Sequence, residues 1–131
     1  MRERLVFVGE NRSQTAQEKG YSWEECQRTG HPVLSAIRLF DALSSIGLDP
    51  NVQIFINLWE DNANPNQMSP LILKEMSEEG EIIVAMGRKV SAELKRLGIP
   101  HKKIIHPAAR GKIANKIRYR FHIKEALQDK G

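Results

Sequence analysis

The sequence has only one cysteine, Cys26, in 131 residues. A single thiol excludes an internal disulfide, an iron–sulfur cluster held by four thiolates and a zinc site built from cysteines. No apolar run approaches the roughly 18 residues that a membrane span requires. The first residues, M-R-E-R, are too charged for a secretory signal. We therefore expect a cytoplasmic protein with no metal, no cofactor and no membrane partner.

Length and composition indicate an ordinary globular domain. Apolar residues make up 40% of the chain and charged residues 27%, which is the usual balance for such domains. A chain of this length corresponds to one domain and is long enough to bury a sizeable core. We predict a single domain over residues 1–131, and we expect a monomer.

The charge is distributed unevenly along the chain. Residues 1–87 contain 7 Lys and Arg against 13 Asp and Glu, a net charge of −6. Residues 88–131 contain 13 against 3, a net charge of +10. A basic segment of this density indicates a surface that meets a polyanion. A solvated basic helix is the alternative, and the charge pattern alone leaves both open.

Short apolar runs alternate with helical periodicity. We expect strands where apolar runs are bounded by Gly, Pro or polar residues, at residues 4–9, 52–58, 81–87 and 103–106. We expect helices at residues 31–46, from Ser69-Pro70 to 79–80, at 88–97 and at 112–128. Residues 10–30 are predicted to form a long loop. This order predicts an α/β fold of three layers, α/β/α, with a four-stranded parallel central sheet.

Polar side chains follow three of the predicted strands. Glu10 and Asn11 come after the first strand, Asn57 ends the second, and His106 ends the fourth. Because ligands bind at the carboxyl ends of parallel strands, we expect these side chains to converge on one edge. A carboxylate, an amide and an imidazole suit recognition of a polar ring, with water activation or charge stabilisation. Each alone is commonly structural, so the hypothesis depends on their convergence.

The last predicted helix has a basic ridge. Its members recur every four residues: Lys112, Lys116, Arg120 and Lys124. Like charges at this spacing oppose helix formation by roughly 0.2–0.5 kcal/mol per pair. Such a ridge indicates a bound anion, for which phosphate is the natural candidate. The adjacent apolar row is expected to pack on the sheet: Ile113, Ile117 and Phe121.

Several of these segments also resemble a known family. The segments are R-L-V-F-V-G-E, G-H-P-V-L-S-A-I-R-L-F-D-A-L-S-S-I-G-L-D, I-F-I-N, I-I-V-A-M-G-R-K-V and I-I-H-P. In order and spacing they resemble the uracil-DNA glycosylase superfamily, and its small thermophile-type members most. The resemblance covers roughly residues 4–127. It implies hydrolysis of the N-glycosidic bond of uracil, or of a related deaminated base, in DNA.

The resemblance also implies roles for individual residues. Glu10 or Asn11 would position the attacking water, Asn57 would read the edge of uracil, and His106 would stabilise the departing uracil anion. Residues 107–112 match the loop that enters the minor groove. The chain departs from the family where Asn11-Arg12-Ser13 replaces Ala-Pro-Gly, where Ala108 replaces Ser, and where the iron–sulfur cysteines are missing.

The aromatic side chain that stacks on uracil in the family is replaced by Val33. Tyr21, Trp23 or Trp59 would have to take its place. The implied partner is DNA containing uracil, which must be flipped out of the duplex before it reacts. The basic residues expected to contact DNA are Arg88, Arg110, Lys112, Lys116 and Arg120.

Two other functions stay open at this point. The chain could be a non-catalytic module of the same fold that binds nucleic acid or a nucleotide. It could also be an unrelated small α/β enzyme that acts on nucleotides. The absence of a Gly-rich phosphate loop of the P-loop or dinucleotide type disfavours this last function.

Overall fold

Four short apolar segments form one parallel sheet. The computed structural model describes residues 4–11, 23, 34–60 and 64–127. Its central strands are β1 (Leu5–Gly9), β2 (Ile54–Asn57), β5 (Ile82–Met86) and β6 (Lys102–Ile104). They lie in the order β2-β1-β5-β6, and all neighbours are parallel. The predicted four-stranded parallel sheet is therefore confirmed.

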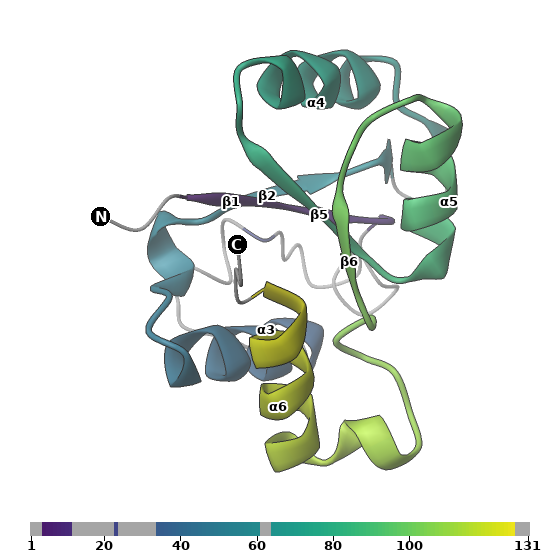
Figure 1. The fold of residues 1–131 in the computed structure, drawn as a ribbon. Helices are drawn as coiled ribbons and strands as arrows, with labels where there is room; N and C mark the ends of the chain where they lie inside the picture. Colours follow the sequence, from purple (N-terminus) through teal and green to yellow (C-terminus); the bar gives the residue numbers. More distant parts are fainter. Residues whose placement is uncertain (1–3, 12–22, 24–33, 61–63, 128–131) are drawn as a thin grey trace.

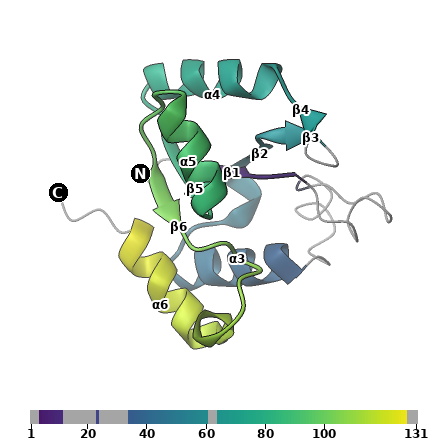
Figure 2. The ribbon, with the colours of Figure 1, turned by 90° about the vertical axis from the view of Figure 1, so that its right-hand side faces the viewer.

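Helices cover both faces of this sheet, because parallel neighbours need crossover connections. One face carries α3 (Leu34–Ser45) and α6 (Lys116–Leu127), and the other carries α4 (Met68–Glu78) and α5 (Arg88–Arg96). Figures 1 and 2 show the resulting layers, with α3 and α6 below the strands, α4 above them and α5 to the right of them in Figure 1. The predicted three-layer α/β/α arrangement is confirmed.

Strand β1 lies between two hydrophobic cores. Its side chains alternate between the faces of the sheet, as the strand period of two requires. Leu5 and Phe7 belong to the core under α3 and α6, whereas Val6 and Val8 belong to the core under α4 and α5. All four side chains are buried, which accounts for the continuous apolar run in the sequence.

The stretch after β2 contains more structure than expected. Residues predicted as turns form a small antiparallel pair, β3 (Trp59–Glu60) with β4 (Asn64–Pro65). Helix α4 starts at Met68, because Asn66 Oδ1 accepts hydrogen bonds from the N–H groups of Met68 (3.0 Å) and Ser69 (3.1 Å). Ser69 is therefore not the cap that the sequence predicted. Its Oγ instead donates to the carbonyl oxygen of Asn57 at 2.9 Å.

The last two predicted elements also differ from the structure. Strand β6 ends at Ile104, so His106 lies in the following loop and not at the strand end. The predicted helix 112–128 is divided into a short 3-10 helix, η3 (Lys112–Ala114), and α6. Asn115 separates them, and its Oδ1 accepts hydrogen bonds from the first free N–H groups of α6. Lys112 therefore does not share a helix with the rest of the ridge.

The anion that faces this ridge is a carboxylate of the protein itself. Arg120 Nε and Nη2 donate to Asp41 of α3 at 2.9 and 2.7 Å, and Lys116 Nζ lies 3.5 Å from the same carboxylate. The hydrogen-bonded Arg120 holds the pKa of Asp41 below its ordinary value. The expectation that phosphate is the natural partner of Lys116 and Arg120 is therefore not needed to explain their spacing.

The apolar row of the last helix does not pack on the sheet as predicted. Ile117 and Phe121 are 64% and 63% exposed, whereas Tyr119 and Ile123 are buried against the core. Ile113, in η3, is partly buried against the same core. Within the described part of the chain, no helix is long and apolar enough to span a membrane.

Replacing Asp41 by Asn should destabilise the protein by about 1 kcal/mol, because it removes a bidentate, partly exposed contact between α3 and α6. The pKa of Asp41 is lowered in the fold. Its stabilisation is thus present above the pKa of the unfolded carboxyl group and is lost as the pH falls through the folded-state value. Urea unfolding of both proteins, near neutral pH and in acid, measures the difference.

The matched control is Arg96→Gln, which breaks the exposed Glu93–Arg96 pair within α5. It should cost less stability than Asp41→Asn, because this pair is exposed to solvent and lies within one helix. An Asp41→Asn variant that loses no more stability than this control would contradict the bridging role of Asp41.

Candidate active site

The ends of β1 and β2 hold two of the predicted site residues side by side. Gly9 and Asn57 are register partners on these neighbouring strands. The pairing continues beyond β2, where Leu58 N donates to Gly9 O at 2.8 Å and Trp59 N donates to Glu10 O at 2.9 Å. The backbone of Glu10 is therefore fixed beside the chain that leaves Asn57.

The side chain of Asn57 has a defined orientation. Trp23 Nε1 donates a hydrogen bond to Asn57 Oδ1 at 3.1 Å. An indole N–H can only donate, so the amide atom that faces it must be the oxygen. The NH₂ group of Asn57 therefore points away from Trp23 as a donor. Gly9 leaves room for this arrangement, because a Cβ there would lie 3.1 Å from Asn57 Oδ1.

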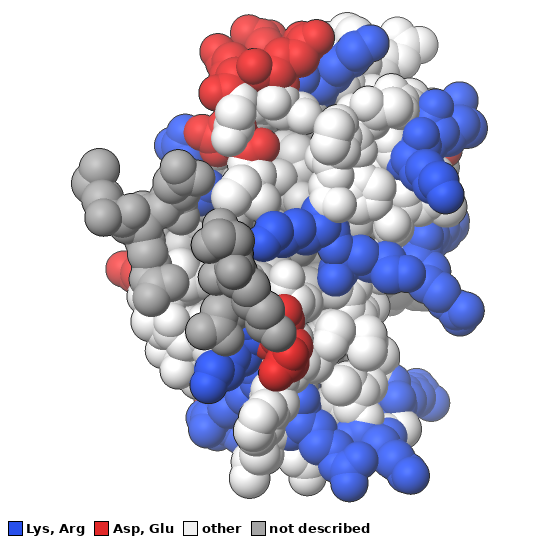
Figure 3. All heavy atoms as spheres, viewed as in Figure 1, with Lys and Arg blue, Asp and Glu red and all other residues white. Residues whose placement is uncertain are grey.

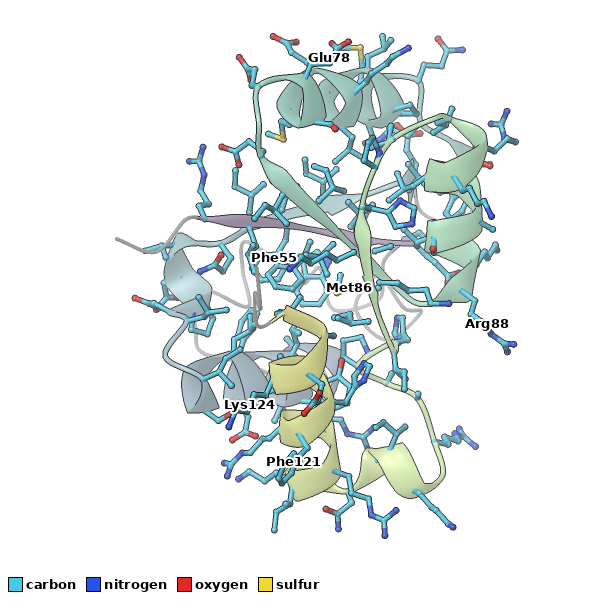
Figure 4. All side chains as sticks on the ribbon, viewed as in Figure 1. Phe55, Glu78, Met86, Arg88, Phe121 and Lys124 are labelled. Carbon is cyan, nitrogen blue, oxygen red and sulfur yellow. The ribbon has the colours of Figure 1, made fainter. Side chains whose placement is uncertain are left out.

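The position of Trp23 is fixed by an aromatic stack. Its ring lies on Phe55 with centroids 4.8 Å apart and planes 18° apart. Phe55 in turn stacks on Phe7 at 5.3 Å. Figure 4 shows Phe55 and Met86 at the centre of the molecule. Phe55 could not be singled out from the sequence, where it is one apolar residue in the strand segment I-F-I-N.

His106 lies against the start of helix α5. A Cβ on Gly87, the residue before that helix, would lie 3.5 Å from His106 Cβ, and Gly87 has a φ of 98° that disfavours other residues. The Nδ1 atom of His106 accepts a hydrogen bond from Ala108 N at 3.0 Å. The proton of the neutral imidazole is therefore on Nε2, which makes Nε2–H a donor.

The electrostatic surroundings keep this imidazole neutral near pH 7. Burial lowers the pKa of His106 below its ordinary value, and the nearby negative charge of Glu10 opposes this effect without overcoming it. The charge of Glu10 thus acts on His106, although the two residues follow different strands. The candidate site contains a carboxylate, Glu10, and a neutral hydrogen-bond donor, His106, on which its charge acts.

Lys89 is a site residue that the sequence did not single out. Its Nζ lies 3.6 Å from Glu10 Oε1 and 5.2 Å from the centroid of the Trp59 ring. This amine therefore links Glu10, which follows β1, to the β3 segment through an ion pair and a cation–π contact. The available signal was its position in the first turn of the helix that follows Gly87.

The loop that carries His106 is held by side chains from α3 and α6. Arg38 Nη1 donates to the carbonyl oxygens of Pro107 (3.2 Å) and Ala109 (2.9 Å). Tyr119 Oη donates to Ile105 O, and Ile105 N donates to His122 Nε2, both at 2.8 Å. Burial raises the pKa of Tyr119 and lowers that of His122, so both stay neutral in the forms that these hydrogen bonds require.

The remaining predicted residues fall into distinct groups. Arg88 is exposed at the first position of α5 and points away from the body of the protein (Figure 4). Arg110 and Lys112 are exposed beyond the His106 loop, whereas Lys116 and Arg120 face Asp41. Asn11 is partly buried next to Glu10. Tyr21, like Cys26, lies outside the described residues.

The part of the chain that the structure describes contains no candidate metal site. There, no group of three or more His, Cys, Asp or Glu residues could hold a metal ion. Comparison of the sequence with protein-family models and with curated proteins gives no match. The relation to uracil-DNA glycosylases therefore stays a prediction from the sequence motifs.

Replacing Glu10 by Gln should lower the pKa of His106 further, because the variant removes the negative charge that favours the imidazolium form. NMR titration of the His106 ring nitrogens measures this pKa and reports the tautomer at the same time. The control is Glu78→Gln on α4, which should leave the titration unchanged. An unchanged or raised His106 pKa in Glu10→Gln would show that the two groups do not interact.

Proposed function

We propose that this protein is a DNA glycosylase that hydrolyses the N-glycosidic bond of uracil, or of a related deaminated base, in DNA. The observation that carries the proposal is His106 beyond β6, whose Nδ1 accepts from Ala108 N so that the neutral imidazole has its N–H donor at Nε2, and on which the charge of Glu10 acts. The class of reaction is inferred from the sequence motifs that resemble uracil-DNA glycosylases. The side chains of His106 and Glu10 are chemically suited to that reaction.

The reaction needs a donor where negative charge develops on the leaving base. As the bond between the sugar carbon and the base nitrogen breaks, its electron pair moves onto the base. A hydrogen bond from His106 Nε2–H to a base carbonyl oxygen would stabilise that charge by roughly 3–4 kcal/mol, as other oxyanion donors do. The neutral imidazole would stabilise the anion by donating a hydrogen bond while it keeps its own proton.

On the sugar side of the bond, positive charge develops in the transition state, so a negatively charged group is needed there. Glu10 would favour the developing positive charge of the sugar and would direct a water to the sugar carbon. The water oxygen forms the new bond to carbon, and its proton passes to the carboxylate. Asn11, next in the chain, is the second candidate to position this water. Catalysis would require the Glu10 carboxylate to leave its ion pair with Lys89 at least in part.

Asn57 would recognise the flipped base through its amide. Its NH₂ group points away from Trp23 and can donate to a base carbonyl oxygen. Trp23 and Trp59 are the described aromatic residues at this edge that could lie against the base, and Tyr21 stays a third candidate from the sequence. Arg88, Arg110 and Lys112 would contact the phosphates.

A non-catalytic module that binds nucleic acid or a nucleotide is the second candidate. The ion pair between Lys89 and Glu10 favours it, because it engages the carboxylate that catalysis would need. Incubation with a uracil-containing oligonucleotide, followed by alkali to cleave abasic sites, separates the two functions. Base release supports the glycosylase, and binding without release supports the module.

His106→Ala should slow single-turnover release of uracil by roughly 10²–10³, the usual loss for one such donor. Affinity for the DNA should change by less than about tenfold, because the interaction forms mainly in the transition state. The matched control is His101→Ala, since His101 is bound to Ser91 Oγ and Ile99 O before β6. A rate loss in His101→Ala equal to that in His106→Ala would remove the catalytic assignment.

DNA binding should depend on exposed cations such as Arg110 and Lys112, and not on Arg120, which is paired with Asp41. The double variant Arg110→Gln with Lys112→Gln should reduce the slope of log affinity against log salt by about 0.9 for each phosphate that it no longer neutralises. Arg120→Gln should leave the slope unchanged, because its guanidinium is already bound to Asp41. Fluorescence anisotropy with a labelled duplex at several salt concentrations measures both. Equal slopes in the double variant and the wild type would contradict the proposal.

A further inference from the structure

Helix α4 presents an apolar and acidic face to solvent. Met68 and Leu71 are 62% and 63% exposed, and Ile72 beside them is also exposed. These positions recur at the spacing of one helix face, and Glu75 and Glu78 continue the same face. Leu73, by contrast, is buried against the sheet. Large apolar residues gathered on one exposed face mark an interaction site.

Helix α6 also presents an exposed apolar face, and the residues that flank it are mainly positively charged. Ile117 and Phe121 are four residues apart on its outer side and are nearly as exposed as Met68 and Leu71. Arg118 and Lys124, both exposed, flank them, and Glu125 follows at the end of the face. Lys116 and Arg120, which precede Lys124 on the same ridge, pair with Asp41.

These two faces lie at opposite ends of the molecule. Helix α4 covers one face of the sheet and α6 the other, and both views of the ribbon show them far apart (Figures 1 and 2). Figure 3 shows the largest group of Asp and Glu over α4, whereas Lys and Arg lie over the right-hand and lower parts. Figure 4 places Glu78 at one end and Phe121 with Lys124 near the other.

We propose that a second copy of this chain binds head to tail, with the α4 face of one protein on the α6 face of the next. The apolar residues of each face would cover those of the other, and Glu75 and Glu78 would meet Arg118 and Lys124. Symmetric pairing is disfavoured, because α4 on α4 would bring like charges together and so would α6 on α6. The sequence alone led us to expect a monomer, and the experiments below distinguish the two.

Such an interface is heterologous, since two different surfaces meet. Heterologous contacts extend to rings or open chains and do not stop at a dimer. Neither face includes Glu10, Asn57 or His106, so the association is independent of the proposed function.

Sedimentation velocity of nuclease-treated, DNA-free protein tests this inference. At low salt, the weight-average mass should rise above that of the monomer between about 10 µM and about 1 mM, the range of weak association. Addition of about 1 M salt, where the Debye length is about 3 Å, should raise the dissociation constant at least about tenfold. A protein that stays monomeric over this whole range would overturn the proposal.

Charge reversal identifies the surfaces. Glu75→Lys with Glu78→Lys should abolish association, and Arg118→Glu with Lys124→Glu should do the same. An equimolar mixture of the two variants should associate again, because the acidic α6 of one then meets the basic α4 of the other. The control, Lys95→Glu with Lys103→Glu, has the same net charge as the α6 variant and should associate like the wild type.

Each outcome decides the proposal once circular dichroism shows that the variants are folded. Association of either face variant alone, at the wild-type level, would indicate a symmetric contact or another surface and would refute the head-to-tail arrangement. A mixture that stays monomeric would refute it as well.

Discussion

The segment 105–109 depends on side chains from two helices for its backbone hydrogen bonds. Tyr119 and His122 of α6 bind both polar groups of Ile105, and Arg38 of α3 binds the carbonyl oxygens of Pro107 and Ala109. This loop lies beyond the end of β6, and these bonds satisfy backbone groups that a longer β6 would have paired with a strand. The placement of His106 thus depends on how α3 and α6 pack, which Asp41 and Arg120 help to fix.

The sequence predicts the sheet well because its signals are local. The buried run of β1 and the glycine after β5 each mark an element without any knowledge of distant residues. The basic ridge shows the limit of such reasoning. Asp41, which neutralises Lys116 and Arg120, lies 79 residues before Arg120 in the chain, and no spacing rule can pair them. A ridge of like charge therefore indicates an anion but not whether that anion is internal.

The inward face of the last helix shows a second limit. Its two apolar rows, Ile117 with Phe121 and Tyr119 with Ile123, have the same spacing, so periodicity alone cannot choose between them. The structure buries the second row, in which Tyr119 also supplies a hydroxyl group for the carbonyl oxygen of Ile105. Likewise, the convergence of Glu10 and His106 follows from strand order, whereas the contacts of Trp23 with Asn57 and of Lys89 with Glu10 needed the fold.

The packing of Trp23 gives the protein an optical property of its own. The chain has two tryptophans, and both lie at the carboxyl edge of the sheet: Trp23 stacks on Phe55 and donates to Asn57, and Trp59 lies under Lys89. Indole emission responds to ring contacts and to nearby charge. The tryptophan fluorescence of this protein therefore comes entirely from the candidate site, so that an unlabelled molecule that binds there would change the emission spectrum.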